Sequence, residues 1–152
     1  MKRRIRGFTT DEVGDWVALL ECGHRQHVRH QPPLVERPWV LSEEGRAGKL
    51  GAVLDCVRCD DGELPAEFLA YKRTDVFSES SMPAGLRQNH ATKAGVWAKI
   101  VVLEGRLRYC IEAQNRQTEL SPTAPGIVVP EVRHHVEPLG PVRFFVEFYR
   151  AP

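Results

Sequence analysis

Histidine and cysteine, the residues that most constrain how this chain can fold, are confined almost entirely to two compact groups. The first group is a Cys-Gly-His-x-x-His-x-x-His run at residues 22–30, completed by a Cys-x-x-Cys pair at residues 56–59. The second group is His90 with the adjacent pair His134 and His135. Imidazole and thiolate bind transition metals well near neutral pH, so each group is expected to gather around its own centre. We therefore expect two metal sites, one structural and one functional.

Length, charge and composition restrict the class of protein. The 152 residues allow one medium domain or two small ones, and a formal net charge of +1 gives no support for general binding to nucleic acid. The 12 glycines and 11 prolines favour short strands and turns over long helices. No apolar run is long enough to cross a bilayer, and the first residues lack the apolar stretch of a signal peptide. We expect a cytoplasmic protein without a membrane partner, in which a Cys-x-x-Cys pair binds metal rather than forming disulfides.

The first segment of the chain is predicted to be a small β module. Residues 5–8 and the apolar, β-prone residues 16–20 predict a hairpin, because the connection between them is rich in Thr, Asp and Gly. Ser42 is a fair N-cap for a short helix that extends to about Leu50, although two glycines weaken that helix. Residues 51–55 return as a strand that leads into the Cys-x-x-Cys pair.

Zinc is the metal that the first Cys/His group predicts. Cys22 and His24 share a parity along an extended chain, and a Cys-x-x-Cys turn places two thiolates within reach of one tetrahedral ion. The preferred ligands are therefore Cys22, His24, Cys56 and Cys59. His27 and His30 compete for the fourth position, and a reactive dithiol is the alternative interpretation of the cysteine pair. Because a core of roughly 60 residues is too small to stand alone, the metal would stabilise the fold.

Several longer stretches of this module carry a family resemblance. They are Gly7-Phe8, Asp15-Trp16-Val17-Ala18-Leu19, the run from Cys22 to His30, Pro32-Pro33, Arg37-Pro38-Trp39-Val40, Gly45-Arg46 and Cys56-x-x-Cys59-Asp60. This pattern resembles a small bacterial domain family of unknown function over nearly the whole segment. The resemblance supplies no activity, but it supports a Cys/His-rich zinc-binding module at residues 1–62.

Residues 64–152 are predicted to form a second unit made almost wholly of strand and turn. The main predicted strands are residues 98–103, 106–111, 126–130, 132–137 and 142–149. The first two are expected to form a hairpin across Glu104-Gly105, and the last two a hairpin across residues 138–141. Many short strands joined by Gly and Pro turns indicate a mainly β sandwich or jelly roll.

Four motifs in the second unit carry a further resemblance. They are His90-Ala-Thr92-Lys93-Ala-Gly95-Val-Trp97, Leu103-Glu104-Gly105, Pro130-Glu131-x-x-His134 and Val146-Glu147-Phe148-Tyr149. They resemble the cupin-like domain of tellurite-resistance proteins over about residues 67–150. That domain precedes a methyltransferase in some bacteria and stands alone as a small stress-associated protein in others. The resemblance implies a double-stranded β-helix, or jelly roll, with a metal pocket in which His90 and His134 are ligands.

The second unit departs from the general cupin pattern at this metal site. Cupin enzymes usually present a His-x-His pair followed by a glutamate, whereas Thr92 stands here in place of the second histidine. His90 and His134 alone make an incomplete set, which needs a carboxylate, another imidazole or water. Glu147 is the candidate carboxylate, although a salt bridge with Arg143 fits its position equally well. The sequence therefore predicts a second divalent metal of undetermined identity.

The sequence also predicts the positions or roles of other residues in the second unit. Lys93 and Trp97 are candidate ligand-binding residues because they follow the first histidine of the pair closely, although a tryptophan in a small sheet more often belongs to the core. His135 is expected at the surface, since it points to the opposite strand face from His134. Cys110 alternates with arginines, so it need not be buried, and a lone cysteine in a strand is usually inert.

Three functions fit these patterns. The preferred one is a metal-binding, stress-associated accessory protein that resembles the tellurite-resistance type and binds a small molecule, an anion or a metal-bound ligand. The alternatives are a cupin metalloenzyme that uses His90 and His134, and a nucleic-acid-binding regulator that reads through the zinc module. Balanced charge disfavours nucleic acid, and no Gly-rich phosphate loop or Gly-x-Ser-x-Gly motif is present. Cupins often pair through edge strands, so a homodimer is the default expectation.

Overall fold

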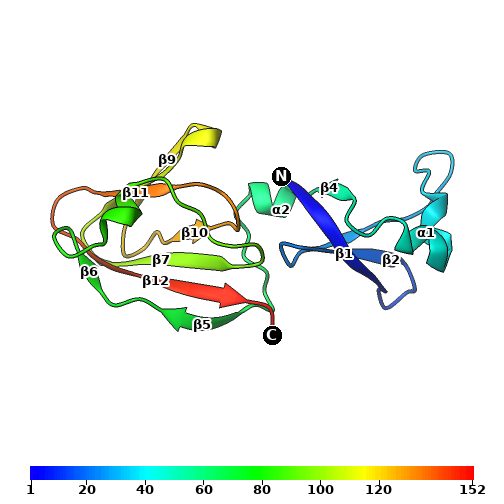
Figure 1. Cartoon of the computed structure of the whole chain (residues 1–152), viewed down its shortest axis with the longest axis horizontal. Coiled ribbons are helices and arrows are strands. Elements are labelled where there is room, and N and C mark those ends of the chain that lie inside the picture. The colour runs from blue at the N-terminus through cyan, green and yellow to red at the C-terminus, as the bar shows by residue number, and fades with distance from the viewer. The chain divides into compact units, whose positions relative to one another are not determined.

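The computed structural model describes residues 1–152 and divides them into two compact units, Met1–Pro65 and Ala66–Pro152. Strands dominate both units, and the helices are short (Figure 1). The mainly β class predicted from the sequence is therefore confirmed. None of the helices combines the length and the apolar character that crossing a bilayer demands.

A four-stranded antiparallel sheet forms the base of the first unit. Its strands are β1 (Lys2–Thr10), β2 (Trp16–Leu20), β3 (Arg25–His27) and β4 (Val53–Asp55), and their order is β3-β2-β1-β4. The predicted hairpin of β1 and β2 is confirmed by their antiparallel register. Leu20 at the end of β2 lies opposite Ile5, and Asp55 at the end of β4 lies opposite Lys2. Both strands therefore end beside the start of β1, which brings the segments that follow them together.

Short helices connect and complete this sheet. They are η1 (Pro38–Leu41), α1 (Glu43–Ala47) and α2 (Val57–Asp60). The predicted N-cap of α1 is confirmed, because the Ser42 hydroxyl accepts a hydrogen bond from the Gly45 N–H at 3.0 Å. The helix ends at Ala47, earlier than predicted, and Gly48 caps it. Gly45 is required by packing, since a Cβ there would lie 2.2 Å from the backbone oxygen of Trp39.

Two antiparallel sheets form the second unit. The larger contains β5 (Leu69–Arg73), β6 (Phe77–Ser78), β7 (Trp97–Glu104), β10 (Gly126–Val128) and β12 (Arg143–Arg150). Its order is β10-β7-β12-β5, and β6 also pairs with β12. The smaller sheet, in the order β11-β8-β9, contains β8 (Leu107–Ile111), β9 (Arg116–Leu120) and β11 (His135–Pro138). The connections include the short helices η2 (Ala84–Arg87) and η3 (Glu112–Gln114).

Both hairpins predicted for this unit are wrong. β7 pairs with β10 and β12, whereas β8 pairs with β9 and β11, so the turn at Glu104-Gly105 carries the chain from one sheet to the other. β11 and β12 likewise belong to different sheets (Figure 1). The physical reason is that a crossover between packed sheets uses the same Gly and Pro turns as a hairpin, so a turn motif does not identify the pairing.

These two crossovers contact each other at Gly105. Its φ of +79° lies in the left-handed region that glycine adopts without strain. A Cβ at this position would lie 2.1 Å from the backbone oxygen of Pro141, which belongs to the second crossover. A glycine is therefore needed for the two connections to pack closely.

One apolar core lies between the two sheets. Its buried side chains include Ile100, Val102, Val128 and Phe144 from the larger sheet and Leu107, Tyr109, Ile111, Leu120 and Val136 from the smaller one. Sheets that pack face to face around one core are common to sandwiches and jelly rolls. The more specific cupin assignment stays a prediction.

Candidate functional site

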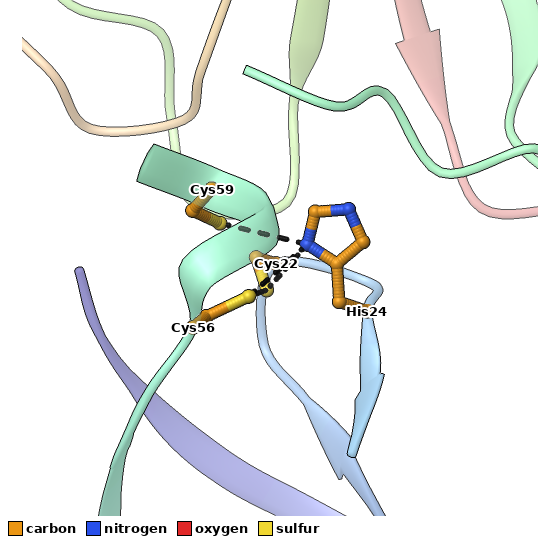
Figure 2. Close-up of side chains that lie close together, drawn as sticks. All are labelled: Cys22, His24, Cys56 and Cys59. Atoms are coloured by element: carbon orange, nitrogen blue, oxygen red, sulfur yellow. Dashed lines mark hydrogen bonds between the residues drawn. The ribbon is translucent and has the colours of Figure 1, made fainter. Parts of the chain in front are cut away.

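Four metal-binding side chains from distant parts of the first unit converge on one point (Figure 2). Cys22 and His24 come from the tight turn between β2 and β3, where Gly23 has a φ of +95°. Cys56 precedes α2, and Cys59 lies within it. Their Sγ atoms and one imidazole nitrogen lie within 4.8 Å of one another, and all four side chains are buried. The structure thus brings together the four residues preferred as zinc ligands, which we call the Cys3His cluster.

Distances within the Cys3His cluster match those of a tetrahedral metal site. His24 Nδ1 lies 3.5 Å from the Sγ of Cys22, 3.3 Å from that of Cys56 and 3.6 Å from that of Cys59. The Sγ atoms of Cys22 and Cys56 are 4.0 Å apart. A zinc ion at about 2.3 Å from sulfur and about 2.0 Å from nitrogen requires ligand separations of about 3.5–3.8 Å. The cluster can therefore hold a metal ion with little movement of its side chains.

A hydrogen bond holds the His24 ring in the orientation that a metal ligand needs. Its Nε2 lies 2.7 Å from the backbone oxygen of Glu63, and a carbonyl oxygen only accepts, so Nε2 carries the hydrogen. The lone pair of a neutral ring then lies on Nδ1, which faces the three sulfurs (Figure 2). Partners beyond the metal ligands fix the tautomer of histidines in this way.

The three thiols of the Cys3His cluster differ in acidity. A hydrogen bond from Cys59 lowers the pKa of Cys22 to about 4, and the backbone N–H of His24 contributes in the same direction. The same hydrogen bond raises the pKa of Cys59, and burial raises the pKa of Cys56. One thiolate is therefore favoured without a cation, while a bound divalent ion stabilises the deprotonated form of every thiol that coordinates it.

The two competing histidines lie outside the Cys3His cluster. His27 Nε2 is 2.8 Å from a carboxylate oxygen of Asp11, and its side chain is half exposed. His30 Nδ1 accepts a hydrogen bond from the backbone N–H of Arg37 at 2.9 Å. His27 and His30 are therefore not among the side chains that converge in the Cys3His cluster, because local hydrogen bonds hold them elsewhere.

A cavity of about 490 Å³ lies within the second unit. Its apolar wall comes from both sheets and from η2, and includes Phe77, Leu86, Ile100, Val128, Val136 and Phe148. Its polar lining includes Lys72, Thr74, His90, Thr92, Lys93 and His134. No aspartate or glutamate lines it. Sequence reasoning missed the apolar wall, although alternation along residues 144–148 gives a signal for part of it.

His90 and His134 meet in this cavity. Their backbones pair through two hydrogen bonds of 2.9 and 2.8 Å, and their ring centroids are 4.3 Å apart. Each Nδ1 donates to the backbone oxygen two residues earlier, Gln88 for His90 and Val132 for His134, at 2.9 Å. Because the hydrogen lies on Nδ1, each neutral ring offers Nε2 as its acceptor or metal-binding atom. The predicted approach of the two histidines is therefore present.

Burial keeps one of these histidines neutral. His134 is 3% exposed, and this burial lowers its pKa to about 4. The hydrogen bond to the backbone oxygen of Val132 acts in the opposite direction, while His90 and His135 lower the pKa further. Tyr109 packs edge-on against its ring at 5.5 Å between centroids. At neutral pH His134 is therefore an uncharged donor of a lone pair.

Glu147, the candidate carboxylate of this site, lies away from the two histidines. Glu147 forms an ion pair with Arg73 at 2.6 Å and accepts a hydrogen bond from Tyr149 at 2.5 Å. Val146 and Phe148 line the cavity, so alternation along β12 points Glu147 away from it. Glu147 therefore does not join His90 and His134, and the expected partner Arg143 instead pairs with Glu104.

Of the two candidate ligand-binding residues, Lys93 lines the cavity and Trp97 does not. Lys93 lines the cavity and is exposed, as a residue at its opening would be. Trp97 is fully buried and does not line the cavity, because its neighbours Val96 and Ala98 on the opposite parity of the chain face it instead. Trp97 is therefore not a lining residue of this cavity.

Cys110 and His135 are more buried than expected. The side chain of His135 is only 13% exposed, and its ring nitrogens lie 3.0 Å from Asn89 Oδ1 and 3.2 Å from a Glu137 carboxylate oxygen. Cys110, opposite His135 in the register of β8 and β11, is 3% exposed, and burial raises its pKa. Cys110, His135 and Glu137 lie within 4.8 Å of one another. Arg108 also pairs with Glu137, so this group forms a hydrogen-bonded ion-pair network on the smaller sheet.

Comparison with known families divides the chain in the same two parts. Residues 6–63 match a family described as protein of unknown function (DUF3565), and residues 72–146 match the TehB-like domain. A probable S-adenosyl-L-methionine-dependent methyltransferase TehB from Haemophilus influenzae (strain ATCC 51907 / DSM 11121 / KW20 / Rd) is 35% identical over 43 residues. The same protein from strain 10810 is 33% identical over 43 residues. Each match covers 28% of this chain and only 15% of the relative.

Two solved structures share the fold of part of the chain. The crystal structure of TehB from Haemophilus influenzae has a TM-score of 0.53 and 26% identity, over 57% of this chain and 32% of that chain. The crystal structure of a protein from E. coli (strain K12) has a TM-score of 0.56 and 21% identity, over 59% of this chain and 97% of that chain. At the latter identity the likeness concerns the fold alone.

Proposed function

We propose that this chain, which joins a DUF3565 domain to a TehB-like domain, is a metal-stabilised ligand-binding protein of the tellurite-resistance type. In this proposal a zinc ion holds the first unit together, and the second unit binds a small ligand in its cavity as part of an oxyanion-stress response. One observation carries the proposal: the cavity presents two imidazoles of fixed tautomer among apolar walls. Small-molecule sites share this combination of a concave apolar wall and a few convergent polar groups.

A structural role fits the Cys3His cluster. Three sulfurs and one nitrogen complete a tetrahedral set, and a complete set leaves no position for substrate or water. The cluster also ties the turn after β2 to the segment after β4, which lie far apart in the sequence. Zinc is the metal we propose, because it favours thiolate and imidazole ligands in this geometry.

The cavity of the second unit has a different chemistry. The Nε2 atoms of His90 and His134 supply two of the ligands that a second divalent metal needs, and Glu147 is not available as a third. A metal bound here would therefore complete its coordination with water or with atoms of the ligand itself. A metal-bound ligand and a directly bound ligand both fit this arrangement.

Metal analysis of full-length protein tests whether the two sites are separate. We expect protein purified without added metal to contain zinc, and Cys59→Ser to lose about one equivalent of it. His134→Ala should keep that equivalent and lose only metal held in the cavity. Cys110→Ser is the matched control, since Cys110 is also buried but lies outside the Cys3His cluster. A loss of the same zinc in both Cys59→Ser and His134→Ala would contradict two independent sites.

Methyl transfer and metalloenzyme chemistry have less support. The chain covers about 15% of the length of the TehB methyltransferases that it matches, so their activity does not extend to it on this likeness. A metalloenzyme built on His90 and His134 would be supported by turnover that His134→Ala abolishes. Without a protein carboxylate beside the two imidazoles, ligand binding remains the simpler function.

Nucleic-acid binding by the first unit also has less support. Several of its basic side chains already pair with carboxylates of the same unit: Arg29 with Asp15 at 2.9 Å and Arg6 with Glu21 at 3.7 Å. Such pairs reduce the charge available for phosphates. Homodimer formation through the exposed edge strand β5 also remains a proposal.

A further inference from the structure

We infer that the ligand of the second unit is an organic monoanion, with one carboxylate-like group at the lysines and an apolar body inside the cavity. This inference rests on the proposed function, that is, on the cavity being a ligand site. It goes further by naming the chemical class of the ligand. The size, the walls and the charge of the cavity each support it.

The cavity is much larger than a bare inorganic oxyanion. The volume of about 490 Å³ falls within the range of about 300–1,000 Å³ that small-molecule pockets have. A water molecule occupies about 30 Å³ of liquid, so an oxyanion of three or four oxygens fills roughly a fifth of the space. An oxyanion alone would leave most of the cavity to water against apolar walls.

The walls select an apolar body. Ala98, Ile100, Val128 and Phe144 line the cavity, and each has 2% exposure or less. Phe148 on β12 also lines it, opposite Lys72 in the register with β5. Each methylene that moves from water to such a wall raises affinity about fourfold. The affinity should therefore grow with the length of an apolar chain until the cavity is full.

The charge of the lining selects an anion. Lys72 and Lys93 line the cavity, both are exposed, and no aspartate or glutamate accompanies them. A carboxylate at the opening can therefore pair with ammonium groups while remaining partly hydrated. The Nε2 atoms of His90 and His134 carry lone pairs, so a carboxylate reaches them only through a metal ion that both bind. Pairing with the lysines and binding through such a metal ion both require an anionic head, and the walls require an apolar tail.

Calorimetric titration of the full-length protein tests this class directly. The probes are acetate, butanoate, hexanoate, octanoate and 3-phenylpropanoate, with octanamide as the neutral counterpart and sulfate and tellurite as inorganic anions. Each is titrated with and without added zinc, which separates direct binding from binding through a metal. We expect affinity to rise about fourfold per methylene from butanoate to octanoate. Octanamide should bind about tenfold more weakly than octanoate.

Variants test the head group without disturbing the core. Lys72→Gln combined with Lys93→Gln should weaken octanoate about tenfold and leave octanamide unchanged. Lys99→Gln is the matched control, because Lys99 lies on β7 but faces Tyr149 rather than the cavity. Hydrogen exchange of β7 and β12 in each variant confirms that the unit remains folded.

The outcomes separate this inference from the proposed function. If octanamide matches octanoate, or if affinity is independent of chain length, the cavity binds ligands but the inferred class is wrong. If tellurite or sulfate binds more tightly than every organic anion, the inferred class is also wrong. If neither organic anions nor metals bind in a manner that depends on His134, the inference and the proposed function both fail.

Discussion

The two donor groups of this molecule differ in how complete they are. The Cys3His cluster contains four buried donors whose ligand atoms lie within 4.8 Å of one another. The His90–His134 pair contains two donors beside a cavity of about 490 Å³, and no carboxylate completes it. Both groups use residues that bind transition metals, so residue type does not distinguish their roles. The number of donors and the adjoining cavity are the reasons why we propose a structural role for the first group and ligand binding for the second.

The apolar cores of the two units that contain these donor groups also differ. The first unit packs its small core on one sheet, with buried residues such as Ile5, Leu20 and Val40. The second unit has a larger continuous core between two sheets. Removing the metal should therefore affect the first unit severely and the second unit little.

Cys59→Ser should produce the largest effect and test this contrast most strongly. Loss of one thiolate weakens a structural zinc site, and zinc binding contributes about 10–16 kcal/mol to folding in zinc-finger peptides. We expect residues 1–65 to lose slow hydrogen exchange while the second unit keeps it. Residue-resolved hydrogen exchange and zinc content measure this. His27→Ala is the control, since His27 is half exposed and outside the cluster. Equal loss of protection in both units would break the contrast.

Phe144→Ala should destabilise the second unit and leave the first unit intact, with a smaller loss of stability than Cys59→Ser causes in the first unit. Phe144 is fully buried, lines the cavity and contacts Phe77 with ring centroids 5.7 Å apart. Deleting a buried phenyl ring costs about 3–5 kcal/mol, because apolar burial is lost and a void remains. Urea unfolding followed by signals from the second unit should show this loss. Zinc content should be unchanged, and loss of zinc in this variant would show that the two units are not independent.

Acid should weaken the second unit through His134. Burial lowers the pKa of His134 to about 4 from its ordinary value of 6.5, so between these values the unfolded chain binds more protons than the folded one. The free energy of unfolding of the second unit is therefore at its full value above about pH 6.5, and it falls by up to roughly 3 kcal/mol as the pH drops towards 4. Urea unfolding of the second unit at several pH values, in chelator, measures this slope.

Two histidine variants show whether that slope belongs to the buried ring. His134→Gln should flatten the pH dependence between about pH 6.5 and 4. His27→Gln should leave it unchanged, because His27 is half exposed and lies in the other unit. A slope that survives in His134→Gln would mean that another group causes the acid sensitivity.

The sequence predicts the first donor group better than the second for a physical reason. Cys22 and His24 lie in one turn, and Cys56 and Cys59 in another, so local geometry fixes each pair and only one long-range contact has to form. These pairs depend on short segments, which sequence patterns describe well. The close approach of His90 and His134 is a long-range contact that is implied only by the resemblance to the cupin-like domain, and the structure contains it.

Strand pairing and the third ligand depend on long-range packing, which sequence patterns describe poorly. The turn at Glu104-Gly105 was expected to close a hairpin, but its strands belong to different sheets. Glu147 follows Val146 in a strand whose two faces both contain aromatic residues, so composition alone does not identify the cavity face. Both faces of β7 likewise carry apolar side chains, so composition does not show whether Trp97 faces the cavity. His135 is contacted by Asn89, which lies far away in the sequence, and it lies opposite Cys110 in the sheet register.

Glu147→Gln should have the smallest effect and sharpen the contrast between the two donor groups. It removes an ion pair with Arg73, whose side chain is 58% exposed, so the loss of stability should stay below about 1 kcal/mol. Burial, with a contribution from the Glu147 carboxylate, raises the pKa of Tyr149 to about 12, so ultraviolet titration should show this pKa falling in the variant. Metal content and carboxylate affinity of the cavity should be unchanged. If Glu147→Gln instead loses metal that His134→Ala also loses, the carboxylate completes the second site, and that site is as closed as the first.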